Sequence, residues 1–151
     1  MVNKIEVWVT NKSQNFNSAR DIVGFVDLGE IEGNISNTIP GFAGNGTAYP
    51  SNGSNGMYQE LINNYSGIRN SGKVTQTLKS ISGFDIGVDW EKIDQARKLT
   101  ATEFTFNESL GFISLNSPLN NDEVLAIAFD YTLGGEVYKV GEFSDDPGSD
   151  P

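Results

Sequence analysis

The feature that most constrains the fold is the stretch from Thr102 to Phe143, in which short apolar runs alternate with turn signals. Polar or glycine-containing turns separate four such runs, namely 103–107, 112–115, 124–131 and 137–140. Gly134 and Gly135 form a two-residue turn suited to a tight hairpin, because glycine takes positive φ without steric cost. Turn signals about 8–12 residues apart between aromatic and β-branched runs are typical of antiparallel sandwiches and barrels. We therefore expect four antiparallel strands here, onto which the rest of the chain packs.

Two apolar runs near the N-terminus predict two further strands. Residues 5–10 alternate between apolar and polar side chains, and residues 22–28 are rich in β-branched residues and flanked by Asp21 and Gly29. A hairpin of these two strands is the simplest arrangement.

The middle of the chain is less regular. Apolar residues spaced three and four apart predict one short helix from Met57 to Tyr65. From Lys73 to Ile81 the apolar spacing suits a helix, whereas the Val and Thr content suits a strand, and we favour the strand. Residues 84–90 alternate and predict a strand, and residues 96–99 predict an extended segment leading into 103–106.

The length of 151 residues fits a single domain. We expect residues 1–144 to form this β-rich, water-soluble domain, interrupted by a long Gly/Asn-rich loop at about 31–56 that is exposed and partly mobile. Residues 145–151 predict a flexible acidic tail or a truncated linker, and both chain ends resemble cuts made in a longer protein. The predicted fold class is mainly β: an antiparallel β-sandwich-like domain with one short helix.

Composition narrows the function classes. Ten basic and twenty acidic residues give a net charge of −10, which argues against binding to nucleic acid or to an anionic membrane surface. The preferred explanation of this negative charge is solubility, and the alternative is a surface that binds basic partners or Ca²⁺. The chain has no Cys and no His, so it lacks disulfides, thiolate metal ligands and the commonest general base.

Three groups of side chains could have a catalytic or binding role, but a purely structural role also explains each of them. Neighbouring carboxylates could hydrolyse glycosides, but they stand where acidic residues favour solubility; the pairs are Asp27 with Glu30, Asp122 with Glu123, and Asp145 with Asp146. Oxygen ligands for Ca²⁺ could come from Asp145, Asp146 and Asp150, although a solvated tail explains them better. An aromatic sugar platform could form, although a buried core is the commoner role, from Trp8, Trp90, Phe112 and Tyr131. We assign no catalytic, cofactor-binding or metal-ligating residue and expect no enzyme activity and no cofactor.

Nine short motifs follow one another along the chain. In order they are IEVWVTN (5–11), IVGFVDLGE (22–30), WEKIDQARKL (90–99), EFTF (103–106), LGFISLN (110–116), LN (119–120), DEVLA (122–126), AFDYT (128–132) and VGEFS (140–144). Together they resemble an internal segment of the SprA/Sov family, very large outer-membrane proteins of the Bacteroidota linked to gliding motility and type 9 secretion. The resemblance reaches both ends of the chain and leaves out the Gly/Asn-rich middle.

The resemblance implies a domain of an outer-membrane translocon, a giant barrel through which folded cargo crosses. The short strands and polar loops of this chain imply a water-exposed insertion in the cell envelope, facing the periplasm or the exterior, rather than barrel wall. Its implied partners are other parts of the same large chain, secretion-system subunits and secreted cargo, with a structural or docking role. Two alternatives remain: a carbohydrate-binding β-sandwich module of a cell-surface protein, with its site at 39–56 including Tyr49, and a carboxylate-based glycosidase.

Overall fold

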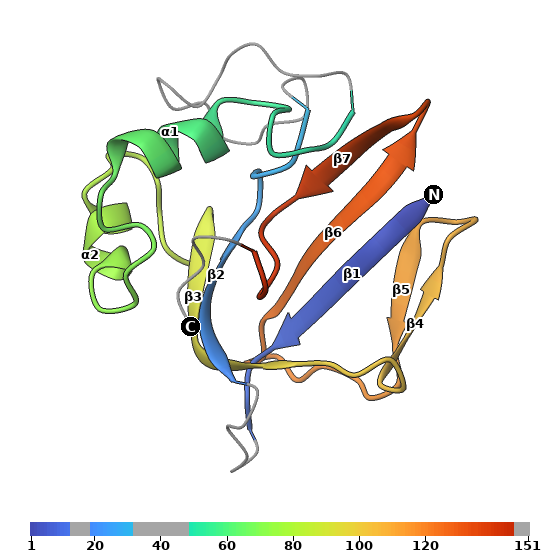
Figure 1. Ribbon diagram of the computed structural model, residues 1–151. Coiled ribbons are helices and arrows are strands. Elements are labelled where there is room, and N and C mark those ends of the chain that lie inside the picture. Colours follow the sequence, from blue (N-terminus) through green and yellow to red (C-terminus); the bar gives the residue numbers. More distant parts are fainter. Residues whose placement is uncertain (13–18, 32–48, 147–151) are drawn as a thin grey trace.

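Figure 1 shows the computed structural model, which describes residues 1–12, 19–31 and 49–146. These residues form a mainly β domain with two antiparallel sheets, which confirms the predicted fold class. The elements in chain order are β1 (Val2–Val9), β2 (Arg20–Phe25), α1 (Met57–Asn64), α2 (Val74–Lys79), β3 (Trp90–Lys98), β4 (Phe104–Asn107), β5 (Phe112–Leu115), β6 (Leu125–Leu133) and β7 (Glu136–Val140).

The five-stranded sheet has the order β2-β3-β1-β6-β7, with β1 at its centre. Strand β3 belongs to both halves of this sheet: Trp90 to Ile93 and, after a register shift, Ala96 pair with β2, whereas Arg97 and Lys98 pair with β1. At this shift the strand bends at Gln95, which has φ 50° and donates its N–H to Asp21 Oδ1 at 2.8 Å. As a result β2 and the first half of β3 turn away from the plane of β1, β6 and β7 (Figure 1).

The predicted hairpin of the two N-terminal strands is wrong, because β3 lies between β1 and β2. The four strands predicted between 102 and 143 all form, but they do not stay together. Strands β4 and β5 make a separate two-stranded sheet, while β6 pairs with β1 on one side and β7 on the other. Strand β1 therefore pairs along one edge with a strand more than a hundred residues away, a pairing that local patterns do not reveal.

The segment predicted as a strand between Lys73 and Ile81 instead contains helix α2. Val74, Leu78 and Ile81 lie on one face and are buried in a core cluster, so the three- and four-residue spacing decides the structure over the β-propensity of Val and Thr.

The strand predicted from Phe84 to Trp90 is also wrong. Gly83 and Gly87 have φ values of 81° and 79°, so the backbone turns twice, and Asp89 Oδ2 accepts a hydrogen bond from the N–H of Asp85 at 2.7 Å. The segment contributes one isolated bridge before β3 begins at Trp90.

Most of the described buried hydrophobic side chains form two clusters, and Val7, Val9, Ala128 and Phe143 are buried outside them. The larger one joins the helices to β2 and β3 and contains Met57, Leu61, Val74, Leu78, Ile81, Phe84 and Trp90. The smaller one contains Trp8, Ile93 and Ala96, against which Ile22, Val124 and Ala126 pack.

The predicted Gly/Asn-rich loop lies outside the described residues from 32 to 48, but its last part is packed. Ser51, Ser54 and Asn55 are buried rather than exposed. Asn55 donates to the carbonyls of Asp27 and Glu30 at 2.8 Å each and accepts from the N–H of Met57 at 2.8 Å. These bonds hold α1 against the end of β2, and α1 begins at Met57 as predicted.

Strand β7 ends at Val140 because Gly141 turns the chain, with φ 83°. The turn is held by Asn52, which donates to the Gly141 carbonyl at 2.9 Å and accepts from its N–H at 2.7 Å. A Cβ on Gly141 would lie 3.1 Å from the Cβ of Ala128, so the chain here crosses close over β6.

Replacing Gly141 by alanine is expected to lower the free energy of unfolding by about 2–4 kcal/mol, from the positive φ and the close approach together. Gly83→Ala is the matched control, since Gly83 has φ 81° and nothing lies within 4 Å of its missing Cβ. That variant should lose only about 1–2 kcal/mol. Equal losses in urea unfolding would show that contact with Ala128 does not constrain the turn.

Candidate functional site

A cavity of about 270 Å³ opens where α1, the start of β2 and residues 141–144 meet. Its floor is apolar and includes Val23, Phe25, Leu61, Ile68 and Val74. Its rim is polar and includes Arg20, Asp21, Tyr58, Arg69, Ser71, Lys92 and Glu142. An apolar cavity with a few convergent polar groups is the usual form of a small-molecule site, although this one is slightly below the usual volume.

Glu142 organises one side of the rim. It follows the turn at Gly141, which places its carboxylate between α1 and the loop after it. One oxygen accepts from the Tyr58 hydroxyl at 2.9 Å, and the other pairs with Arg69 Nη1 at 2.6 Å. Burial raises the pKa of the Tyr58 phenol, and the hydrogen bond to Glu142 raises it further. Burial lowers the pKa of Arg69, but the hydrogen bond and charge of Glu142, together with Tyr58, outweigh burial and leave this pKa above its usual value.

Glu142→Gln is expected to lower the pKa of Tyr58 toward the ordinary tyrosine value of about 10, because the amide removes the negative charge that opposes ionisation. The measurement is a spectrophotometric titration of tyrosinate. Tyr58→Phe identifies which transition belongs to this residue. An unchanged Tyr58 transition in the glutamine variant would show that Glu142 does not contact the phenol in solution.

Asp21 organises the other side of the rim at the start of β2. Its carboxylate accepts from the Ser71 hydroxyl and from the Gln95 N–H, and these two hydrogen bonds hold the pKa of Asp21 below its usual value. Lys92 donates to the Ser71 carbonyl at 2.8 Å and pairs with Asp94 at 2.8 Å. The same bonds that shape the bend of β3 therefore also fix this edge of the cavity.

The rim is more basic than the chain as a whole. Arg20, Arg69 and Lys92 line it, three of only ten basic residues in the sequence. Arg20 donates to the Ser144 carbonyl at 2.5 Å, and no carboxylate among the described residues forms an ion pair with it. The arrangement is suited to a small amphipathic molecule whose acidic group meets Arg20.

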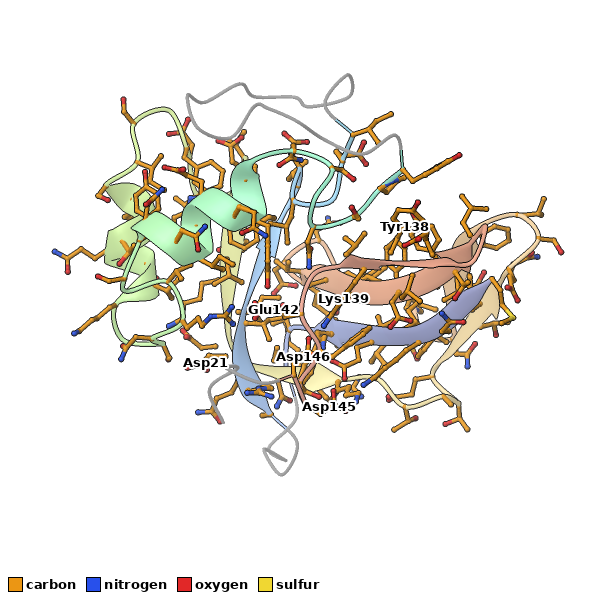
Figure 2. The ribbon with its side chains drawn as sticks, turned by 45° about the horizontal axis from the view of Figure 1, so that its top comes forward. Asp21, Tyr138, Lys139, Glu142, Asp145 and Asp146 are labelled. Atoms are coloured by element: carbon orange, nitrogen blue, oxygen red, sulfur yellow. The ribbon has the colours of Figure 1, made fainter. Side chains whose placement is uncertain are left out.

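A second feature is a row of aromatic rings on β6, β7 and the end of the Gly/Asn-rich stretch. The ring of Tyr138 lies 5.5 Å from Tyr49 and 5.3 Å from Tyr131, which lies 6.0 Å from Phe129. The Tyr131 hydroxyl donates to the Pro50 carbonyl at 2.6 Å. Figure 2 places Tyr138 over the β6–β7 hairpin, whereas Asp21 and Glu142 lie beside β2. The row and the cavity are therefore separate features.

The structure separates the aromatic residues considered as a sugar platform. Trp8 is buried in the smaller core cluster and Trp90 in the larger one, as expected for core residues. Phe112 lies exposed on β5, and Tyr131 belongs to the aromatic row.

The acidic pairs considered for glycoside hydrolysis lie in different parts of the structure. Asp27 is buried and Glu30 lines a groove near β6. In the exposed turn before β6, Asp122 pairs with Lys12 at 2.5 Å and Glu123 accepts from the Asn120 N–H at 3.0 Å.

The beginning of the predicted acidic tail is tied to the sheet. Asp145 pairs with Lys4 at 2.9 Å, and Asp146 pairs with Lys139. Figure 2 shows Lys139, Asp145 and Asp146 near one another. Asp150 lies outside the described residues, among which no group of three acidic side chains is placed to hold a metal ion.

The residues around the cavity were not found from the sequence. Tyr58 and Glu142 stand 84 positions apart, and Arg69 and Glu142 stand 73 apart, so no motif joins them. No family model matches the chain, and a search of curated proteins found no relative. None of the helices within the described ranges is long and apolar enough to cross a membrane.

Proposed function

We propose that this chain is a non-enzymatic domain of an outer-membrane translocon of the SprA/Sov kind, with a structural or partner-docking role in protein secretion and gliding motility. The observation that carries the proposal is the ordered series of nine motifs from residue 5 to residue 144. The mainly β fold is consistent with a water-exposed domain inserted into a larger envelope protein.

The packing of the first and last described segments supports this role. Lys4 pairs with Asp145 at 2.9 Å, and Glu6 accepts from the N–H and the hydroxyl of Ser144 at 2.9 Å each. Residues from both ends of the fold thus meet on β1. Domains whose ends lie close together are tolerated as insertions in other chains.

The test is membrane fractionation of cells that produce the chain, using an antibody raised against residues 49–146. The proposal expects the signal in the outer-membrane fraction, on a polypeptide far larger than 16.4 kDa. A cytosolic marker protein followed in the same fractions is the control. A free cytosolic protein of the size of this chain would refute the proposal.

A carbohydrate-binding module is the second candidate, favoured by the aromatic row. Tyr49 is 46% exposed and packs edge-on against Tyr138, and exposed aromatic rings stack on the apolar faces of sugars. Glycan-array binding that disappears in Tyr49→Ala would support this candidate. Phe112→Ala is the matched control, because Phe112 is equally exposed but lies on β5. An array on which the wild-type chain binds no glycan would rule out the carbohydrate-binding module.

A further inference from the structure

Strand β6 has an open edge over residues 125–128. The Thr10 N–H donates to the Val124 carbonyl at 3.1 Å, so Thr10 and Val124 form a hydrogen-bonded pair next to the register Val9↔Leu125. Antiparallel pairing alternates, so Ala126 and Ala128 bond to β1, whereas the N–H and C=O of Leu125 and Ile127 point away from it. The Leu99 N–H, which donates to the Val7 carbonyl at 2.8 Å on the opposite side of β1, agrees with this alternation.

Strand β7 covers only the other half of this edge. It pairs with β6 from Phe129 to Leu133, after which Gly141 turns the chain over Ala128 (Figure 1). Among the described residues, no hydrogen bond to the outward main-chain groups of Leu125 or Ile127 is found. An exposed strand edge of this kind is a template for pairing with another chain.

The open edge forms one wall of a groove of about 590 Å³. The opposite walls come from the residues that follow β2 and from the turn before β3, and they include Val26, Leu28 and Val88; Pro50, from the segment before α1, also lines the groove. Val26 and Val88 are 61% and 67% exposed. The groove therefore combines free main-chain groups with uncovered apolar side chains, the two elements of strand addition.

The charges of the groove indicate the kind of strand that fits. Glu30, Glu91 and Glu142 are the only charged residues among those that line it, and Glu142 is already engaged by Arg69 and Tyr58. This leaves Glu30 and Glu91 on its rim, in a chain of net charge −10. A second copy of the same acidic chain would be repelled, whereas a basic segment would be attracted.

We propose that this groove binds an extended, basic segment of a partner protein, which adds to β6 as a strand beside Leu125 and Ile127. Its apolar residues lie against Val26 and Val88, and its Lys or Arg residues meet Glu30 and Glu91. This inference concerns the described groove alone and does not depend on the envelope role proposed above.

The test uses a synthetic peptide of about eight residues with Val and Lys at the alternate positions that face β2 and Thr at the others, long enough at about 3.3 Å per residue to cover the open edge. Binding is followed by calorimetry and by NMR of the amides of the intact chain. We expect saturable binding, with the largest shifts at the amides of Leu125 and Ile127. A peptide with Glu in place of Lys should bind at least about tenfold more weakly, because both rim carboxylates repel it.

Two further variants separate strand addition from charge attraction alone. Two methylated peptides are compared. Methylation of the peptide nitrogens whose N–H groups point toward β6 should abolish binding, because these groups bond to the edge. Methylation of the nitrogens that point away from β6 should change the affinity by no more than about twofold. Glu30→Gln with Glu91→Gln should weaken binding about five- to tenfold, while circular dichroism confirms an unchanged fold. Equal binding of the Lys and Glu peptides, equal effects of both methylation patterns, or self-association of the chain through the edge would overturn the proposal.

Discussion

Trp90→Ala is expected to lower the free energy of unfolding by about 3–5 kcal/mol, the largest single effect in this fold. The indole is 2% exposed, lies in the larger core cluster, and donates its N–H to the Phe84 carbonyl at 3.2 Å. Alanine would leave a cavity between the helices and β2, and it would remove the hydrogen bond from the indole N–H. A domain of this size is stable by only about 5–15 kcal/mol, so the variant should lose a large part of its stability.

The measurement is urea unfolding followed by far-ultraviolet circular dichroism. The control is Val88→Ala, two residues away on an exposed turn, which should change stability by no more than about 0.5 kcal/mol. If Trp90→Ala unfolded at the same urea concentration as the wild type, Trp90 would not hold the helices to the sheet as described.

The second large effect is expected at Glu6, a carboxylate that is only 2% exposed on the central strand. It accepts from the Ser144 N–H and hydroxyl at 2.9 Å each and from Lys98 Nζ at 3.1 Å. Burial raises the pKa of Glu6, but these three donors outweigh it and hold the pKa below its usual value. Glu6→Gln should cost about 2–3 kcal/mol at pH 7, because bonds to a charged acceptor are lost.

This cost should depend on pH in a defined direction. Because the folded pKa of Glu6 lies below the unfolded value of about 4.3, its contribution is complete above that value and disappears as the pH falls through the folded pKa. The stability gap between wild type and Glu6→Gln should therefore narrow from pH 6 toward about pH 3. Asp21, Glu103 and Asp146 also have lowered pKa values, but both proteins share them, so the difference isolates Glu6.

Glu108→Gln is the matched control for this comparison. Glu108 is exposed and accepts one hydrogen bond, from the Val2 N–H at 3.2 Å, so its replacement should change stability by no more than about 0.5 kcal/mol at any pH. A pH-independent gap for Glu6→Gln would mean that the charge of Glu6 contributes nothing to folding.

Local patterns predicted the strands well where one face of a short run is apolar and a turn signal follows. The turn at Gly134 and Gly135 and the strands on either side of it were predicted correctly, as was the start of α1 at Met57. The same reasoning failed between Phe84 and Trp90, where alternation is perfect but two glycines with positive φ break the strand.

Pairing and burial between distant residues were beyond local patterns. Glu6 stands at a polar position of an alternating strand, which normally means exposure to solvent. It is buried because Lys98 and Ser144, 92 and 138 residues away, converge on it. The cavity network of Tyr58, Arg69 and Glu142 arises in the same way, from residues far apart in the sequence. The open edge of β6 also depends on distant residues, because the turn at Gly141 that ends β7 is held by Asn52.

The central place of β1 has a consequence for how the chain is made. Residues 2–9 are synthesised well before residues 125–131, with which they make their most extensive pairing. During synthesis both sides of this apolar strand stay uncovered, a state open to chaperone binding or aggregation. Pairing of β1 with β6 closes a loop of more than a hundred residues, so we expect this domain to fold only after residue 131 has been synthesised, and slowly for its size.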